Sequence, residues 1–126
     1  MMRQLIEPTE DLMDTRVLRE FLEMVGPEGP ALLRSIVETY AVETPPLLLA
    51  LGIALERGDC VAIARLAHRL KGSCLSIGAS GLAARCAILE QACSTGSPPP
   101  RTSLLALEEH FSATTAALRA FVADLR

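Results

Sequence analysis

Glycine and proline divide this chain into segments whose apolar residues recur at helical spacing, and this pattern is its strongest constraint on folding. Leucine and alanine are abundant and β-branched residues are few, which favours helices over a sheet. The connections between segments are short, so consecutive helices should run antiparallel. The pattern predicts an all-α fold: an antiparallel up-and-down four-helix bundle with one or two accessory N-terminal helices.

Residues that start helices stand directly after the breaks. The expected starts are, in chain order, Asp14, Gly29-Pro30, Asp59, Ser80 and Ser103. The second segment leaves two interpretations open, because Thr44-Pro45-Pro46 either caps a new helix or kinks the existing one.

The 126 residues suit one domain with an ordinary core. We expect residues 1–13 to form an N-terminal segment, 96–102 a proline-rich connector and 103–126 the last bundle helix. The longest apolar run, Leu47–Leu55, is far shorter than the ~20 residues that span a bilayer. The N-terminus carries no signal-peptide pattern, which predicts a cytoplasmic protein that binds no membrane. A net charge of −3 argues against nucleic-acid binding.

The four cysteines form no CxxC pair and match no usual zinc spacing. They are Cys60, Cys74, Cys86 and Cys93. We therefore expect buried free thiols and no metal site.

His68 is the candidate functional residue, because helical geometry places it opposite an apolar stripe and facing water. The stripe consists of Ile63, Leu66, Leu70, Cys74 and Ile77. One turn to either side stand Gly72 and Ala64, and the small side chain of Ala64 is expected to keep the preceding turn low for a bound partner. A glycine inside a helix costs about 1 kcal/mol relative to alanine, and here it removes a side chain that would block a partner. The second histidine, His110, is expected at a boundary or on the surface, without a function.

Cations surround this histidine on a protein that is acidic overall. Arg65 and Lys71 flank His68 at three residues' distance, and Lys71 can neutralise a phosphoryl group as a point charge. A neutral imidazole is a nucleophile, while phosphoryl transfer requires mainly positioning and charge stabilisation. One histidine and one lysine therefore suit a group acceptor whose partner completes the active site.

Two exposed apolar residues, Val61 and Leu75, lie within about 20° of His68 on the same face. Next to a reactive histidine we interpret them as a docking patch for a partner. Arg65, Arg69 and Lys71 would form its rim and attract an acidic partner site. For Arg69 a merely solubilising role is the stronger alternative.

The motif Ala67-His68-Arg69-Leu70-Lys71-Gly72-Ser73, followed by Ile77-Gly78-Ala79 and Leu89-Glu90, resembles the histidine phosphotransfer (HPt) domain of multistep phosphorelays. The resemblance covers about residues 14–95. It implies a four-helix bundle phosphorylated on His68, typically at Nε2, with no kinase or ATPase activity of its own. Lys71 then neutralises the phosphate and Gly72 gives the partner access.

The resemblance also implies partners. A receiver-domain aspartate donates the phosphoryl group and another response-regulator receiver accepts it, with a hybrid sensor histidine kinase upstream. Mg²⁺ is bound by the receiver, so this chain needs no cofactor, and it is expected to be a monomer. Some relatives carry glutamine at the position of Glu90; here Glu90 either orients the imidazole or faces solvent.

Two other functions remain open. A helical adaptor would bind a receiver or kinase domain without phosphotransfer. An enzyme using His68 as a general base would need a carboxylate that converges on it, and Glu90 is the one candidate.

Overall fold

The computed structural model describes residues 12–125 and contains five helices and no strand within that range. The helices are α1 (Thr15–Val25), α2 (Gly29–Arg57), α3 (Cys60–Ser76), α4 (Ser80–Ser94) and α5 (Ser103–Ala123). The all-α prediction is confirmed. The short segment expected at residues 1–13 lies almost wholly outside the described residues.

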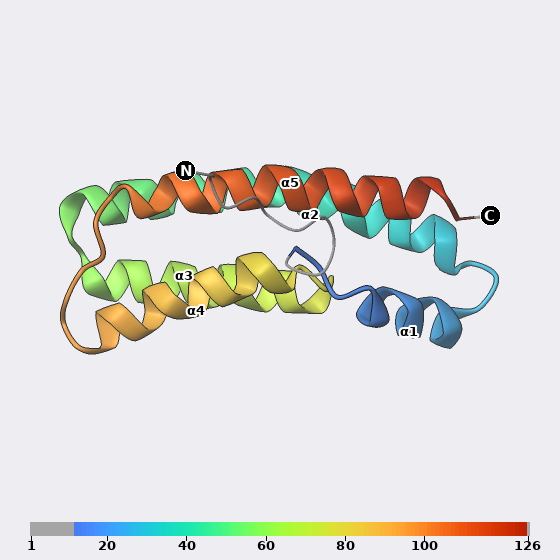
Figure 1. The fold of residues 1–126 in the computed structure, drawn as a ribbon, viewed down its shortest axis with the longest axis horizontal. Coiled ribbons are helices and arrows are strands. Elements are labelled where there is room, and N and C mark those ends of the chain that lie inside the picture. Colours follow the sequence, from blue (N-terminus) through green and yellow to red (C-terminus); the bar gives the residue numbers. More distant parts are fainter. Residues whose placement is uncertain (1–11, 126) are drawn as a thin grey trace, which may run out of the picture.

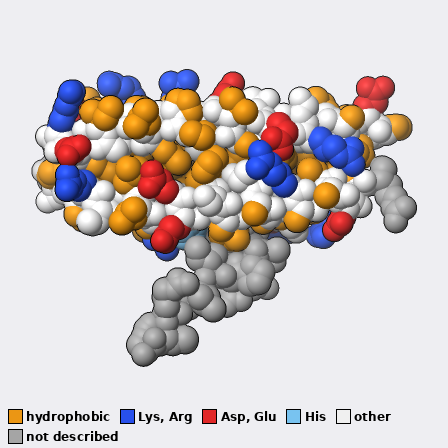
Figure 2. Space-filling model, turned by 90° about the horizontal axis from the view of Figure 1, so that it is seen from above, with side chains coloured by type: hydrophobic (Ala, Val, Ile, Leu, Met, Phe, Trp, Pro, Cys, Tyr) orange, Lys and Arg blue, Asp and Glu red, His pale blue; other side chains and the backbone are white. Residues whose placement is uncertain are grey.

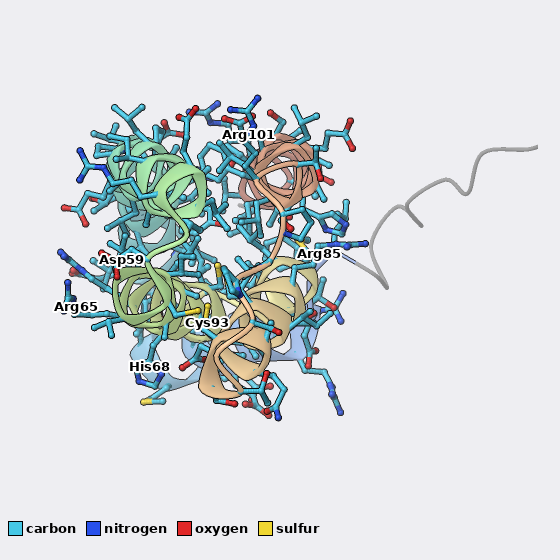
Figure 3. All side chains as sticks on the ribbon, turned by 90° about the vertical axis from the view of Figure 1, so that its left-hand side faces the viewer. Asp59, Arg65, His68, Arg85, Cys93 and Arg101 are labelled. Atoms are coloured by element: carbon cyan, nitrogen blue, oxygen red, sulfur yellow. The ribbon has the colours of Figure 1, made fainter. Side chains whose placement is uncertain are left out.

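Helices α2 to α5 form the up-and-down bundle, with consecutive helices antiparallel (Figure 1). In side view α2 and α5 make one layer, and α3 and α4 make the other. The accessory helix α1 continues the layer of α3 and α4 and packs against the first half of α2. Seen from its end, the bundle places its four helices at the corners of a square (Figure 3).

The core runs along the axis of this square. Its largest fully buried side chains include Leu18, Leu33, Leu51, Ile63, Leu70, Leu82, Leu107 and Leu118. Tyr40 of α2 adds a tilted ring contact with Phe111 of α5, with centroids 5.6 Å apart. Burial of these side chains is the main stabilisation of the bundle, since single helices of the lengths found here are marginally stable in water.

Helix α2 continues through Pro45 and Pro46 rather than ending there. Each proline lacks the N–H that would bond the carbonyl four residues earlier, at a cost of about 3 kcal/mol in a helix interior. Residues Tyr40, Leu48 and Leu51 on either side are buried in the core, so tertiary packing holds both halves in one helix. Of the two interpretations left open, a single helix is the correct one.

By length and composition, α2 is also the one described helix that would be long enough and apolar enough to cross a membrane. This is weak evidence, because the core helix of a soluble protein meets the same criteria. In this fold the buried face of α2 contacts α3 and α5.

The turn between α3 and α4 anchors the start of α1. The Asp14 amide donates to the Gly78 carbonyl at 2.7 Å, and the Gly81 amide donates to the Leu12 carbonyl at 3.1 Å. Asp14 also caps α1 by accepting from the Arg16 amide. One expected cap is wrong: Ser80 is the first helical residue of α4, and Ala79 precedes it without a side-chain cap.

Candidate functional site

Helix α3 presents His68 to solvent. Asp59 begins this helix by accepting from the Ala62 amide, as its position predicts. The opposite side of the helix is buried through Ile63, Leu70 and Cys74, with Leu66 half-buried. The His68 side chain is 72% exposed and projects away from the bundle (Figure 3).

The neighbouring helix α4 brings Glu90 into contact with two residues of α3. One carboxylate oxygen, Oε2, lies 2.9 Å from His68 Nδ1. The other, Oε1, lies 2.6 Å from Lys71 Nζ. Of the two alternatives for Glu90, orientation of the imidazole is the one that the geometry supports. The sequence indicated no pairing between Glu90 and Lys71, because they lie on different helices.

These contacts fix the charge of Glu90. The hydrogen bond from Lys71, and then that from His68, hold the pKa of the Glu90 carboxyl below its usual range despite partial burial. The carboxylate is therefore ionised at neutral pH and accepts hydrogen bonds only. Consequently the proton of a neutral His68 ring is on Nδ1, and the lone pair of Nε2 faces solvent.

The approach to His68 is open on its C-terminal side. Gly72 is exposed, and a Cβ atom added there would meet no other group within 4 Å. Ala64, one turn before His68, is half-buried and packs against the core. Gly72 thus keeps the surface low where the pattern of the sequence predicts it.

The residues expected to form the docking patch lie on both sides of the histidine. Val61 and Leu75 are 72% and 54% exposed. Arg65 is exposed and lies at the edge of α3 in Figure 3. Arg69 instead lines a groove of about 720 Å³ between α2 and α3, together with Glu43 and Ser73. The structure therefore brings His68, Lys71 and Glu90 together and places Arg69 on the flank.

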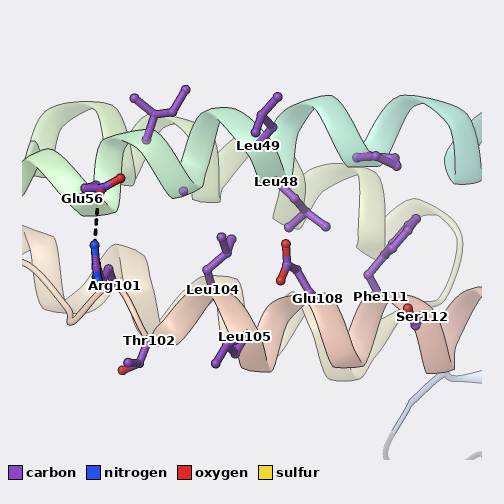
Figure 4. A pocket seen from close by; sticks show the side chains of 13 residues that line it. Leu48, Leu49, Glu56, Arg101, Thr102, Leu104, Leu105, Glu108, Phe111 and Ser112 are labelled. Atoms are coloured by element: carbon purple, nitrogen blue, oxygen red, sulfur yellow. Dashed lines mark hydrogen bonds and ion pairs between the residues drawn. The ribbon is translucent and has the colours of Figure 1, made fainter.

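A cavity between α2 and α5 lies away from this site. It has a volume of about 810 Å³, and its apolar lining includes Leu49, Leu104 and Phe111. At its edge Glu56 of α2 pairs with Arg101 at 2.7 Å (Figure 4). Hydrophobic side chains run along this face between charged ones (Figure 2). Arg101 and His68 lie on opposite sides of the bundle (Figure 3).

The cysteines occur as free thiols. Cys74, Cys86 and Cys93 are buried and Cys60 is half-buried. Burial raises the pKa of the Cys74 thiol to about 11 and that of the Cys86 thiol to about 12. Among residues 12–125, no three histidine, cysteine or acidic side chains are grouped to hold a metal ion.

The expectation for His110 is wrong, since its side chain is buried in α5. It follows Leu107 by three residues and precedes Thr114 and Leu118 on the same helix face. This spacing places His110 in the core, and the flanking Glu108 and Glu109 obscured that signal.

The protein-family model described as the Hpt domain matches residues 35–126. Among solved structures, the chain is similar to histidine-containing phosphotransfer protein B (HptB) from Pseudomonas aeruginosa PAO1. The two are 27% identical, with a TM-score of 0.75 over 94% of this chain and 100% of that one. A search of curated proteins gave no match.

Proposed function

This chain belongs to the Hpt domain family and is a histidine phosphotransfer protein of phosphorelays, and from that premise we propose that His68 is its phosphoacceptor. The observation that carries the proposal is the contact between Glu90 and His68 Nδ1. It leaves Nε2 as the nucleophilic nitrogen on an exposed ring. Lys71, beside the ring, is the cation that meets the phosphoryl charge.

Hpt proteins interact with receiver domains and kinases in phosphorelays. We propose that a receiver-domain aspartyl phosphate is the donor and that a second receiver is the acceptor. The Nε2 lone pair attacks phosphorus, the bond from phosphorus to the aspartyl oxygen breaks, and its electron pair stays on the carboxylate. The Nδ1 proton remains on the ring, bound to Glu90. Onward transfer reverses these steps.

The surroundings of His68 suit a macromolecular partner. Val61 and Leu75 offer exposed apolar contact on either side, while Gly72 leaves the ring accessible. Arg65 and Lys71 supply positive charge for an acidic receiver site, which contributes the Mg²⁺. We propose that the protein acts as a cytoplasmic monomer and supplies no cofactor of its own.

Glu90 also meets the condition for an enzyme with His68 as general base. Such an enzyme needs a site that surrounds its substrate. The cavities of about 810 Å³ and 720 Å³ lie between α2 and α5 and between α2 and α3, and His68 lines neither of them. The His68 side chain is instead 72% exposed and accessible to a macromolecule, which favours a phosphoryl carrier.

Phosphotransfer from a purified, phosphorylated receiver tests this function. The wild-type protein should acquire an acid-labile, alkali-stable label, and the His68→Gln variant should acquire none. The His110→Gln variant, checked for folding by circular dichroism, is the matched control and should keep the label. A label that persists in folded His68→Gln would overturn the assignment. Tight binding of the receiver without any label would instead support an adaptor.

A further inference from the structure

The Glu90 carboxylate binds both groups on which phosphoryl transfer at His68 depends. Its two oxygens lie 2.9 Å from the ring nitrogen Nδ1 and 2.6 Å from the Lys71 ammonium. The same two hydrogen bonds, that from Lys71 first, keep the pKa of the Glu90 carboxyl low. A negative charge therefore stands beside the ring that is to carry a dianionic group.

We propose that Glu90 is a positioning residue that keeps the phosphoryl group on His68 labile, so that the protein passes the group on instead of storing it. This inference rests on the proposed function of His68. Three consequences of the contacts lead to it.

The first consequence concerns the leaving group. Attack by Nε2 on phosphorus gives a phosphorylated ring that still bears the Nδ1 proton and is positively charged. The Glu90 carboxylate accepts a charge-assisted hydrogen bond from that N–H, so the proton stays on Nδ1 while the ring is phosphorylated. When the bond between Nε2 and phosphorus breaks, the electron pair returns to Nε2. The ring then leaves as neutral imidazole rather than as an anion.

The second consequence concerns Lys71. Its side chain is 28% exposed and its ammonium is already paired with Glu90 at 2.6 Å. A phosphoryl group on His68 must share this cation with the carboxylate. Lys71 therefore neutralises the phosphoryl charge less than an unpaired lysine would.

The third consequence is direct repulsion. The phosphoryl group and the carboxylate carry like charges on two sides of one imidazole ring. Since the site is open to water, the repulsion is moderate. It nevertheless destabilises the phosphorylated state in wild type relative to a variant with a neutral residue at position 90.

The lifetime of the phosphorylated protein tests the proposal. Wild type, Glu90→Gln and Glu90→Ala are phosphorylated by a purified receiver and separated from it, and loss of label is then followed over time. Glutamine keeps an acceptor oxygen for Nδ1 but carries no charge. We expect the half-life of the label to lengthen about fivefold in Glu90→Gln and at least as much in Glu90→Ala, with a matching decrease in the rate of donation to a second receiver.

The Glu56→Gln variant is the control, because it removes an equal charge at the distant Arg101 pair. Its label should decay at the wild-type rate. A merely structural role of Glu90 would alter thermal unfolding but not the half-life. Equal or faster loss of label from the Glu90 variants would overturn the inference, whereas absence of label from wild type would overturn the proposed function itself.

Discussion

Lys71 supplies the positive charge beside His68 and Glu90. Its ammonium pairs with Glu90 at the surface of the bundle, and its side chain is 28% exposed. In Lys71→Ala, transfer from the donor receiver to His68 should slow about tenfold, because one point charge that meets the incoming phosphoryl group is lost. Stopped-flow rates measure the transfer, and circular dichroism checks the fold.

The control for this change is Arg119→Ala on α5, which removes a cation that pairs with Glu38. Its transfer rate should equal that of wild type. A wild-type rate in Lys71→Ala would mean that the Lys71 charge does not contribute to transfer.

Two substitutions of Gly72 test its effects on stability and on partner access separately. A Cβ added there meets nothing within 4 Å, so Gly72→Ala should raise the free energy of unfolding by about 1 kcal/mol through helix propensity. Gly72→Leu should also fold, but its side chain should obstruct the partner and slow transfer. Urea unfolding and transfer rates measure the two effects. A Gly72→Leu variant that transfers as fast as wild type would contradict the role in access.

The positions of some of these residues could be predicted from the sequence, whereas the contacts of others could not. Helical periodicity alone placed His68 on the exposed face and Gly72 beside it. The ion pair between Lys71 and Glu90 depends on how far α3 and α4 are shifted along each other, which no spacing within one helix contains. For that reason the role of Glu90 stayed open until the fold was known.

At the scale of elements, the turn between α3 and α4 makes the sharpest prediction. Gly78 has φ +77°, and a Cβ there would lie 2.8 Å from the Asp14 carbonyl oxygen. Gly96 has a similar φ of +81° with nothing within 4 Å. Alanine at either position costs about 1–2 kcal/mol for the left-handed backbone.

Gly78→Ala should cost about 1–2 kcal/mol more than Gly96→Ala, because it also displaces the start of α1. Urea unfolding of both variants gives the difference. Equal costs would show that α1 is not held by this close approach.

Helix starts were predicted where a capping side chain marks them, as at Asp14 and Asp59. The sequence did not predict that α2 continues through Pro45-Pro46. Proline disfavours a helix locally, and here burial of the flanking residues outweighs that local cost. The predicted start of α4 was also wrong by one position, since Ser80 is the first helical residue and not the cap. The turn at Gly78 is fixed by hydrogen bonds to the segment before α1, which a local pattern does not contain.

On the scale of the whole molecule, the proposed phosphotransfer site and the apolar groove lie on different sides of the bundle. The layer of α3 and α4 carries His68, Lys71 and Glu90, whereas the groove between α2 and α5 lies on the other side. Composition and punctuation predicted the bundle, because leucine-rich segments with short connections have few other ways to bury their apolar faces. They did not predict His110 in the core, since its acidic neighbours resemble an exposed segment.

The buried thiols report on the integrity of this bundle as a whole. Burial raises the pKa of Cys74 to about 11 and that of Cys86 to about 12. Burial, together with the neighbouring Cys60 thiol, raises the pKa of Cys93 to about 11. At pH 8 these groups are therefore neutral thiols, and only the thiolate reacts with alkylating agents. Their modification should be limited by opening of the core, whereas half-buried Cys60 should react first.

Mass spectrometry after timed exposure to iodoacetamide at pH 8 measures these rates. One fast modification is expected in the native protein, and it should disappear in Cys60→Ser. Adding urea up to the unfolding midpoint should accelerate the other three together, because they line one cooperative core. Modification of Cys86 at the rate of Cys60 in the absence of urea would mean that α4 separates from the bundle without global unfolding. That result would contradict a rigid scaffold behind His68 and Glu90.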